Sequence, residues 1–255
     1  MTKIAKHISL DILRNKVLLL FTLLLAGIGW SLYSWYPDTS KSLASMLQIV
    51  LLTVPLMSLI FTAIYYYNTY DFIELLVAQP LKRSQIFWGM FAGMALPLSL
   101  SLALSVFVPV LLHSGLVLGL LFCLVVWLLN LVFVSLGMWI AVSHSDKTKG
   151  IGLAFLLWFA CSLLYDALVL IFLFAFSDYP LERPMVVLVA LNPIDLARVA
   201  VLLRSDNAAL MGYTGAVYKD LFSSSLGSLL ALGLMGCWAA LALIRSRRSF
   251  LRKDL

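Results

Sequence analysis

The sequence predicts an all-α integral membrane protein that crosses the bilayer six times. Three observations lead to this fold class: 63% of the 255 residues are hydrophobic, six apolar stretches are long, and basic residues gather in alternate gaps between them. A hydrocarbon core about 30 Å thick needs about 20 helical residues to cross, and each stretch meets that length. Such a composition excludes an ordinary soluble domain. The spans are expected at residues 17–36, 43–67, 86–112, 116–142, 150–176 and 221–244.

The distribution of Lys and Arg orients these spans. Most of the 18 basic residues fall in the N-terminal segment, in the second and fourth gaps and in the tail at 245–255. Because cytoplasmic loops carry the excess of Lys and Arg, this pattern predicts a bacterial inner-membrane protein with both termini in the cytoplasm. The net charge of +6 fits anchoring to an anionic leaflet of membrane lipid and requires no nucleic acid. We expect a single permease domain over residues 1–255.

Residues 1–16 are expected to form an amphipathic helix at the membrane interface. Ile4, Ile8 and Ile12 recur every four residues, and charged side chains occupy the opposite arc. A helix of this kind lies in the plane of the interface. It serves either as a simple anchor before the first span or as an elbow helix against which a cytoplasmic partner can push.

The second gap, residues 68–85, is expected to contact a partner in the cytoplasm. A short amphipathic helix is followed by Pro80, which cannot continue a helix, and then by a basic turn. Both an ordinary loop and a coupling loop fit this pattern. The candidate coupling residues are Asp71, Glu74, Pro80, Lys82, Arg83 and Gln85.

Asp166 is expected deep within the fifth span. A charge at the centre of a membrane helix costs about 2.5–3.5 kcal/mol on translocon scales, so an acidic residue there is a candidate for function. Asp166 is either a polar gate that faces the bundle interior or an interhelical hydrogen-bonding group, paired with a polar side chain such as Asn130 of the neighbouring span.

The last gap, residues 177–220, is expected to lie on the periplasmic surface. Asn192 can cap a helix over 193–203 that begins at Pro193, with Asp195 in its first turn and Arg198 one turn later. The helix is either a lid on the periplasmic rim or a docking site for a periplasmic partner, with Arg198 and Arg204 as contacts.

Neither a catalytic constellation nor a metal site is expected. Cys123, Cys161 and Cys237 fall in three separate spans without ligand spacing, and the three histidines form no cluster. Metal centres need several ligands at suitable spacing. The chain also has no G-x-x-x-x-G-K-[ST] run, so it lacks the loop that cradles ATP phosphates.

Two runs resemble known transport proteins. The run ELLVAQPLKRSQIFWG at residues 74–89 resembles the signature of ABC-2 type permeases. The runs WFACSLLYD at 158–166 and LNPIDLAR at 191–198 resemble the membrane subunit of the Nos-type transporter, which serves copper-centre maturation of nitrous oxide reductase. The resemblance extends over the whole chain.

The resemblance implies a homodimer carried on two copies of a separate cytoplasmic ATPase, which binds ATP and Mg; this chain itself holds no cofactor and is not an enzyme. It also implies a periplasmic repeat protein as a partner. A general ABC-2 exporter of lipid, drug or peptide fits the same residues. An ion-coupled secondary transporter and an intramembrane enzyme fit less well, because the sequence shows neither internal repeats nor clustered polar residues in the spans.

Overall fold

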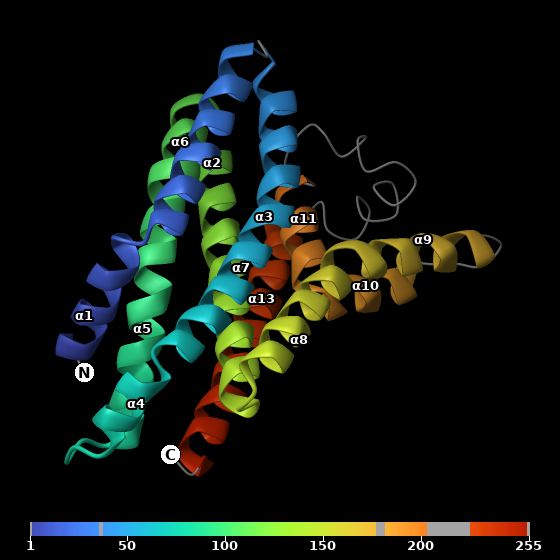
Figure 1. Cartoon of the computed structure of the whole chain (residues 1–255). Helices are drawn as coiled ribbons and strands as arrows, with labels where there is room; N and C mark the ends of the chain where they lie inside the picture. Colours follow the sequence, from blue (N-terminus) through green and yellow to red (C-terminus); the bar gives the residue numbers. More distant parts are fainter. Residues whose placement is uncertain (1, 36–37, 177–181, 203–224, 254–255) are drawn as a thin grey trace.

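The computed structural model describes residues 2–35, 38–176, 182–202 and 225–253 (Figure 1). This part of the chain consists of helices and short turns, so the predicted all-α class is confirmed. The elements are α1 (Thr2–Leu13), α2 (Lys16–Trp35), α3 (Thr39–Asn68), α4 (Tyr70–Val77), α5 (Arg83–Leu102), η1 (Ala103–Phe107), α6 (Val108–His113), α7 (Leu116–Ser143), α8 (Lys147–Phe159), η2 (Ala160–Leu164), α9 (Tyr165–Ala175), α10 (Glu182–Leu191), α11 (Pro193–Leu202) and α13 (Ser225–Arg252).

Within the described residues, six continuous helical segments are long and apolar enough to cross a membrane, as the sequence predicts, and the bent pair Pro184–Leu191 and Pro193–Leu202 would make a seventh if it counts as one broken span. The six are Lys16–Trp35, Thr39–Asn68, Arg83–His113, Leu116–Ser143, Lys147–Ala175 and Gly227–Arg252. The third and fifth each contain a π-helical turn, η1 or η2. The predicted boundaries agree closely except in the last span, where residues 221–224 lie outside the described part and the basic residues of the predicted tail continue α13 as helix.

The fourth span, α7, lies at the centre of the bundle and packs against α3, α5, α11 and α13. It is apolar on all sides, and a helix of that composition is stable when it is surrounded by other helices. Its one amide side chain, Asn130, is fully buried. Asn130 accepts a hydrogen bond from Ser58 Oγ of α3 at 2.7 Å and donates to Ser99 Oγ of α5 at 3.1 Å. This residue therefore ties three spans together.

The predicted N-terminal amphipathic helix is present as α1 and lies along α5 (Figure 1). Ile8 and Ile12 are buried in the contact, as the four-residue spacing predicts. The two helices approach closely at Gly93 of α5, where an added Cβ would lie 2.7 Å from Ile8 Cβ. A comparable close contact occurs at Gly150 of α8, which packs directly against the Tyr67 side chain.

The predicted coupling loop, the basic turn before α8 and the end of α13 lie at one end of the bundle, called here the α4 end. Lys147 Nζ of α8 donates to Asn68 Oδ1 at the end of α3, at 2.8 Å. The Lys253 amine at the end of α13 lies 5.4 Å from the ring centroid of Tyr70 in α4. The basic gaps between the spans therefore meet at the same end, as the alternation in the sequence predicts.

The segment before the last span differs from the expectation of a surface helix. The predicted helix from Pro193 is present as α11, but it packs against both α13 and α7, and all ten residues except Arg198 are buried. The predicted last residue, Leu203, and Arg204 lie outside the described residues. The side chains expected to enter the membrane interface are buried against protein; they are Val199, Val201 and Leu202. α11 itself carries small and branched apolar side chains on all sides, and a helix of that kind is stable inside a bundle.

Candidate functional site

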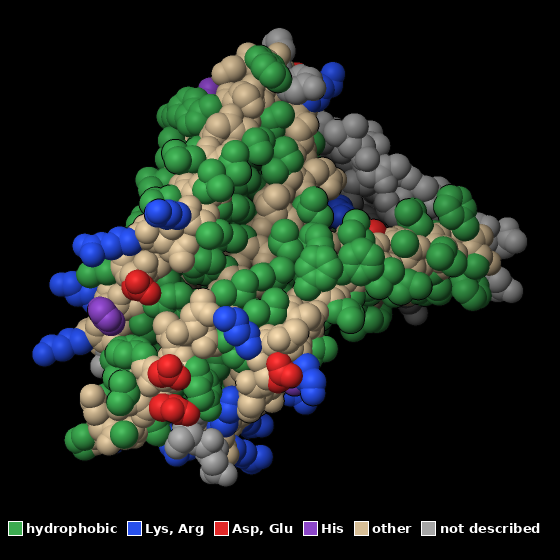
Figure 2. All heavy atoms as spheres, viewed as in Figure 1, with side chains coloured by type: hydrophobic (Ala, Val, Ile, Leu, Met, Phe, Trp, Pro, Cys, Tyr) green, Lys and Arg blue, Asp and Glu red, His purple; other side chains and the backbone are tan. Residues whose placement is uncertain are grey.

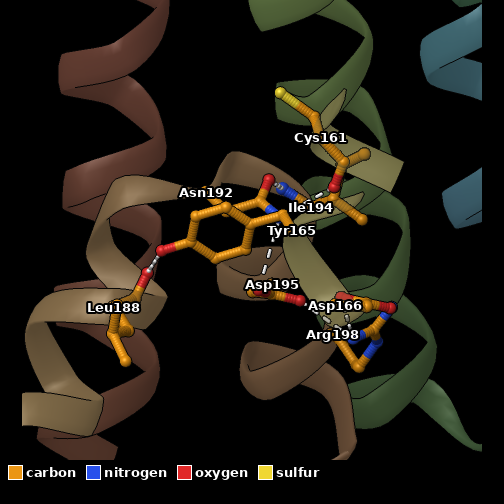
Figure 3. A network of polar contacts seen from close by, with 8 residues as sticks. All are labelled: Cys161, Tyr165, Asp166, Leu188, Asn192, Ile194, Asp195 and Arg198. Atoms are coloured by element: carbon orange, nitrogen blue, oxygen red, sulfur yellow. Dashed lines mark hydrogen bonds and ion pairs between the residues drawn. The ribbon is translucent and has the colours of Figure 1, made fainter. Parts of the chain in front are cut away.

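A polar network joins the fifth span to the corner between α10 and α11 (Figure 3). The fifth span changes from α-helix to π-helix at η2, and π-helical turns inside α-helices occur frequently at functional sites. Opposite this turn, the chain bends by 114° between Pro184–Leu191 and Pro193–Leu202. The network therefore lies where two interrupted helices face each other.

Asn192 occupies the corner and uses both ends of its amide. Its Oδ1 accepts a hydrogen bond from the Ile194 backbone N–H at 3.1 Å, which confirms the predicted N-cap of α11, with Pro193 as the first helical residue. Its Nδ2 donates to the Cys161 carbonyl oxygen within η2 at 2.9 Å. The same nitrogen lies 3.3 Å from Asp195 Oδ2. One side chain thus caps α11 and attaches it to the fifth span.

Arg198 forms ion pairs with two carboxylates. Its Nη1 and Nη2 donate to Asp166 Oδ1 and Oδ2 at 3.1 and 2.8 Å, a bidentate contact between α11 and α9. Its Nη1 also donates to Asp195 Oδ1 at 2.8 Å within α11. The exposed fractions of the side chains are 22% for Arg198, 35% for Asp166 and 10% for Asp195. Bidentate guanidinium–carboxylate contacts are among the stronger hydrogen bonds in proteins.

The expected pairing of Asp166 with Asn130 is wrong. Asp166 pairs with Arg198, whereas Asn130 bonds to Ser58 and Ser99 in the bundle core. Arg198 lies six residues after the cap residue Asn192. It reaches the Asp166 carboxylate because α11 packs inside the bundle. The spacing of Asn192, Asp195 and Arg198 predicts the local helix, but it gives no information about the partner on α9.

Tyr165 contributes a further link that its sequence position did not predict as a site. Its hydroxyl donates to the Leu188 carbonyl oxygen of α10 at 2.5 Å. Tyr165 therefore holds α10 while the adjacent Asp166 holds α11. In the sequence, the one indication that Tyr165 matters was its place beside Asp166 in the run that resembles the Nos-type membrane subunit. The Arg198 guanidinium binds two carboxylates, Asp166 of α9 and Asp195 of α11. This contact can hold the fifth span against α11, or release it when the ion pair between Arg198 and Asp166 opens.

A second candidate site is the α4 surface, defined by the exposed residues of α4 and of the turn that follows it. Ile73 and Leu76 are buried and hold α4 against the bundle, while Leu75 points outward with 67% of its surface exposed. Leu75 was not among the predicted site residues. The predicted coupling residues exposed on this surface are Asp71, Glu74, Pro80 and Lys82, and Gln85 is exposed in the first turn of α5. An apolar side chain among charges of both signs is typical of a protein contact.

Arg83 lies differently from the other predicted coupling residues. It is half-buried, and its Nη1 donates to the carbonyl oxygen of Lys253 at 2.9 Å. Arg83 therefore binds the C-terminal end of α13, where a cation interacts favourably with the helix dipole. Phe250 is fully buried nearby, with its ring 5.8 Å from that of Phe87. The sequence did not indicate that the end of α13 would pack against the second gap.

Two titratable groups at the α4 end have shifted pKa values because they are partly buried. Burial lowers the pKa of the Lys253 amine, which lies over the rings of Tyr66 and Tyr70. Burial raises the pKa of the Tyr70 hydroxyl, and the nearby charge of Glu74 raises it further. Both shifts have the same physical cause, the loss of water around a partly buried polar group.

Groups of three or more His, Cys, Asp or Glu side chains placed to hold a metal ion are absent from the described part of the chain. The predicted site residues other than Asn130, which lies in the bundle core, fall into two arrangements, the network of Figure 3 and the region of α4. The first joins helices within the bundle, and the second is open to a partner.

Comparison with known proteins identifies the family. No family model matches the chain. A probable ABC transporter permease protein NosY from Pseudomonas aeruginosa is 31% identical, and the alignment covers 99% of this chain and 98% of that protein. A protein of the same name from Stutzerimonas stutzeri is 30% identical over 74% of this chain and 76% of its own length. The chain is a multi-pass membrane protein, and it belongs to the NosY family of ABC transporter permeases.

Proposed function

We propose that this chain transmits conformational change, driven by ATP hydrolysis in a separate ATPase subunit, from the α4 surface to the polar network at α9 and α11. The ATPase binds ATP and Mg, and it contacts the α4 surface through Leu75 and the surrounding charges. In this proposal the α4 end is cytoplasmic, because the basic gaps between the spans meet there. The chain acts as a permease subunit and performs no hydrolysis itself.

A continuous series of contacts supports this transmission. At the α4 end, Arg83 binds the end of α13. Further along α13, Trp238 Nε1 donates to the Ala190 carbonyl oxygen of α10 at 3.0 Å, and α13 packs along α11. The bidentate contact of Arg198 with Asp166 then joins α11 to α9. This ion pair is the observation that carries the proposal, because it is the bidentate contact through which a movement of α11 would reach α9.

The Nos-type branch of the proposal rests on the relatives and on the runs that contain Tyr165, Asp166 and Asn192. By this reading the change at α9 and α11 serves copper-centre maturation of nitrous oxide reductase, with a periplasmic repeat protein docked near the α10–α11 corner. Two copies of the chain form a homodimer in the inner membrane. The apolar side chains exposed along α9, among them Leu168, Ile171 and Phe174, provide a surface for the second copy.

The first experiment is affinity purification of the tagged full-length chain from mild detergent, followed by identification of the proteins that co-purify. We expect a soluble P-loop ATPase together with a periplasmic repeat protein. Recovery of the ATPase without a periplasmic protein would contradict the Nos-type branch and leave a general exporter. Absence of any ATPase would contradict the transmission proposal itself.

The contact surface is tested by charge reversal on the co-purified complex. Glu74→Lys and Lys82→Glu are expected to lower the affinity for the ATPase at least about tenfold, because a like charge at a protein contact costs more than ~1.4 kcal/mol. Lys41→Glu, which makes the same charge change outside the α4 end, is the control for Lys82→Glu. Full ATPase affinity and coupling in both α4 variants would exclude this surface as the contact.

A further inference from the structure

A groove between α1 and α5 lies outside both sites described above. Its volume is about 480 Å³, within the ~300–1,000 Å³ typical of small-molecule sites. Small side chains on the two helices create the hollow, and two exposed leucines form its walls. The lining residues are Thr2, Ala5, Lys6, Ser9, Leu10, Ala92 and Leu96.

The floor of the groove is largely apolar, and the Ser9 hydroxyl in it is engaged with the backbone of α5. Ser9 Oγ donates to the Gly93 carbonyl oxygen at 3.3 Å, at the point where the two helices touch. Leu96 and Leu10 are 59% and 45% exposed at the walls. The groove therefore offers an apolar channel along a membrane span to a ligand that has a narrow hydrocarbon chain.

The mouth of the groove is basic. Lys6 lines it, Lys3 lies on the same helix, and both side chains are exposed. Within the described residues, neither amine has an Asp or Glu oxygen within ion-pair distance. Figure 2 shows Lys and Arg side chains projecting along the edge of the molecule where α1 lies in Figure 1. These cations are available to an anionic ligand.

We propose that this groove binds one anionic phospholipid, with an acyl chain along Ala92 and Leu96 and the phosphate beside Lys6. An amphipathic helix with exposed lysines lies at the depth of lipid headgroups, so the bilayer presents both parts of such a ligand to the groove at once. A second copy of the chain is a poorer occupant, because it would bring the lysines of two α1 helices together. The proposal is independent of the ATPase contact.

The test uses the full-length chain in nanodiscs that contain phosphatidylcholine and a small fraction of photoactivatable phosphatidylglycerol. We expect the crosslink to map to peptides of α1 and α5. Ala92→Trp fills the groove and is expected to abolish the crosslink, whereas Leu100→Trp, at an exposed position on the same helix, leaves it unchanged. Lys6→Ala is expected to weaken labelling about fivefold, the ratio that corresponds to ~1 kcal/mol per lysine near the membrane. Lys149→Ala is its charge-matched control.

Four results would overturn the proposal. One is labelling spread over the other exposed spans, and a second is labelling that Ala92→Trp and Leu100→Trp reduce equally. The third is equal labelling by a photoactivatable phosphatidylcholine, which would show that Lys6 does not select for a net negative headgroup. Loss of the crosslink in the co-purified complex would assign the groove to a protein partner and would also count against a lipid.

Discussion

Removal of charges from the Arg198 ion pairs should reveal how strongly α11 is held to α9. Asp166→Asn keeps the shape of the side chain and removes one of the two carboxylates bound to Arg198, which retains Asp195 at 2.8 Å. The loss of hydrogen bonds to a charged group costs about 1.5–3 kcal/mol. Because Asp166 is 35% exposed, we expect the lower half of this range, an approximately 10- to 50-fold change in the unfolding equilibrium.

Arg198→Leu should cost more than Asp166→Asn. It leaves two carboxylates without their shared cation. Removal of one partner from a fully buried pair costs about 3–5 kcal/mol, and because Arg198 and Asp166 are 22% and 35% exposed we expect about 3 kcal/mol, the lower end of that range. In a chain that already carries Asp166→Asn, the same change leaves a single carboxylate. The cost of Arg198→Leu should therefore fall by at least about 1.5 kcal/mol in the double variant.

The double-mutant cycle is measured by equilibrium unfolding of the purified chain in mixed detergent micelles. Free energies of unfolding that add within about 0.5 kcal/mol would refute the reasoning, because residues without a shared interaction behave in that way. ATPase coupling in the complex then separates the two roles of Asp166. Normal assembly with lost coupling in Asp166→Asn indicates a gate, and lost assembly indicates a structural contact between helices.

Three further substitutions test the packing of the bundle, each by the free energy of unfolding in the same micelles. Gly93→Ala places a methyl group against α1 and Gly150→Ala places one against the tyrosine that packs on it, so each should destabilise by about 1–3 kcal/mol. Gly27→Ala and Gly152→Ala are the controls, because an added methyl group there meets no atom within 4 Å. They should be neutral or stabilising by up to ~1 kcal/mol. Equal losses of stability at all four glycines would contradict the assigned contacts. Phe250→Ala should cost about 3–5 kcal/mol, and a loss below 1 kcal/mol would show that the end of α13 is not docked.

The spans and the local helices could be predicted from the sequence because their signals are local. Apolar length identifies each span, and the four-residue spacing of Ile8 and Ile12 predicts the buried face of α1. The cap at Asn192 followed by Pro193 gives the first residue of α11 correctly. Each of these features depends on residues within a few turns of one another.

The contacts between distant segments could not be predicted, because they depend on where helices pack. Asp195 and Arg198 belong to a segment that is expected on the periplasmic surface, yet within the bundle they pair with each other, and Arg198 also pairs with Asp166. The basic residues near Lys253 similarly resemble a solvated tail. In the structure that region continues α13 and binds Arg83, a contact across most of the chain length.

The most direct measurement is the distance between spin labels on α9 and α13, at Leu170 and Leu230, whose side chains are both exposed. The labels are placed in a variant without native cysteines, and the co-purified complex is studied before and after the ATPase is trapped with nucleotide. We predict a shifted distance distribution on trapping in the otherwise unmodified complex and no shift in the Glu74→Lys complex. A distribution that stays the same on trapping, in a complex that hydrolyses ATP, would contradict transmission from the α4 surface to α9.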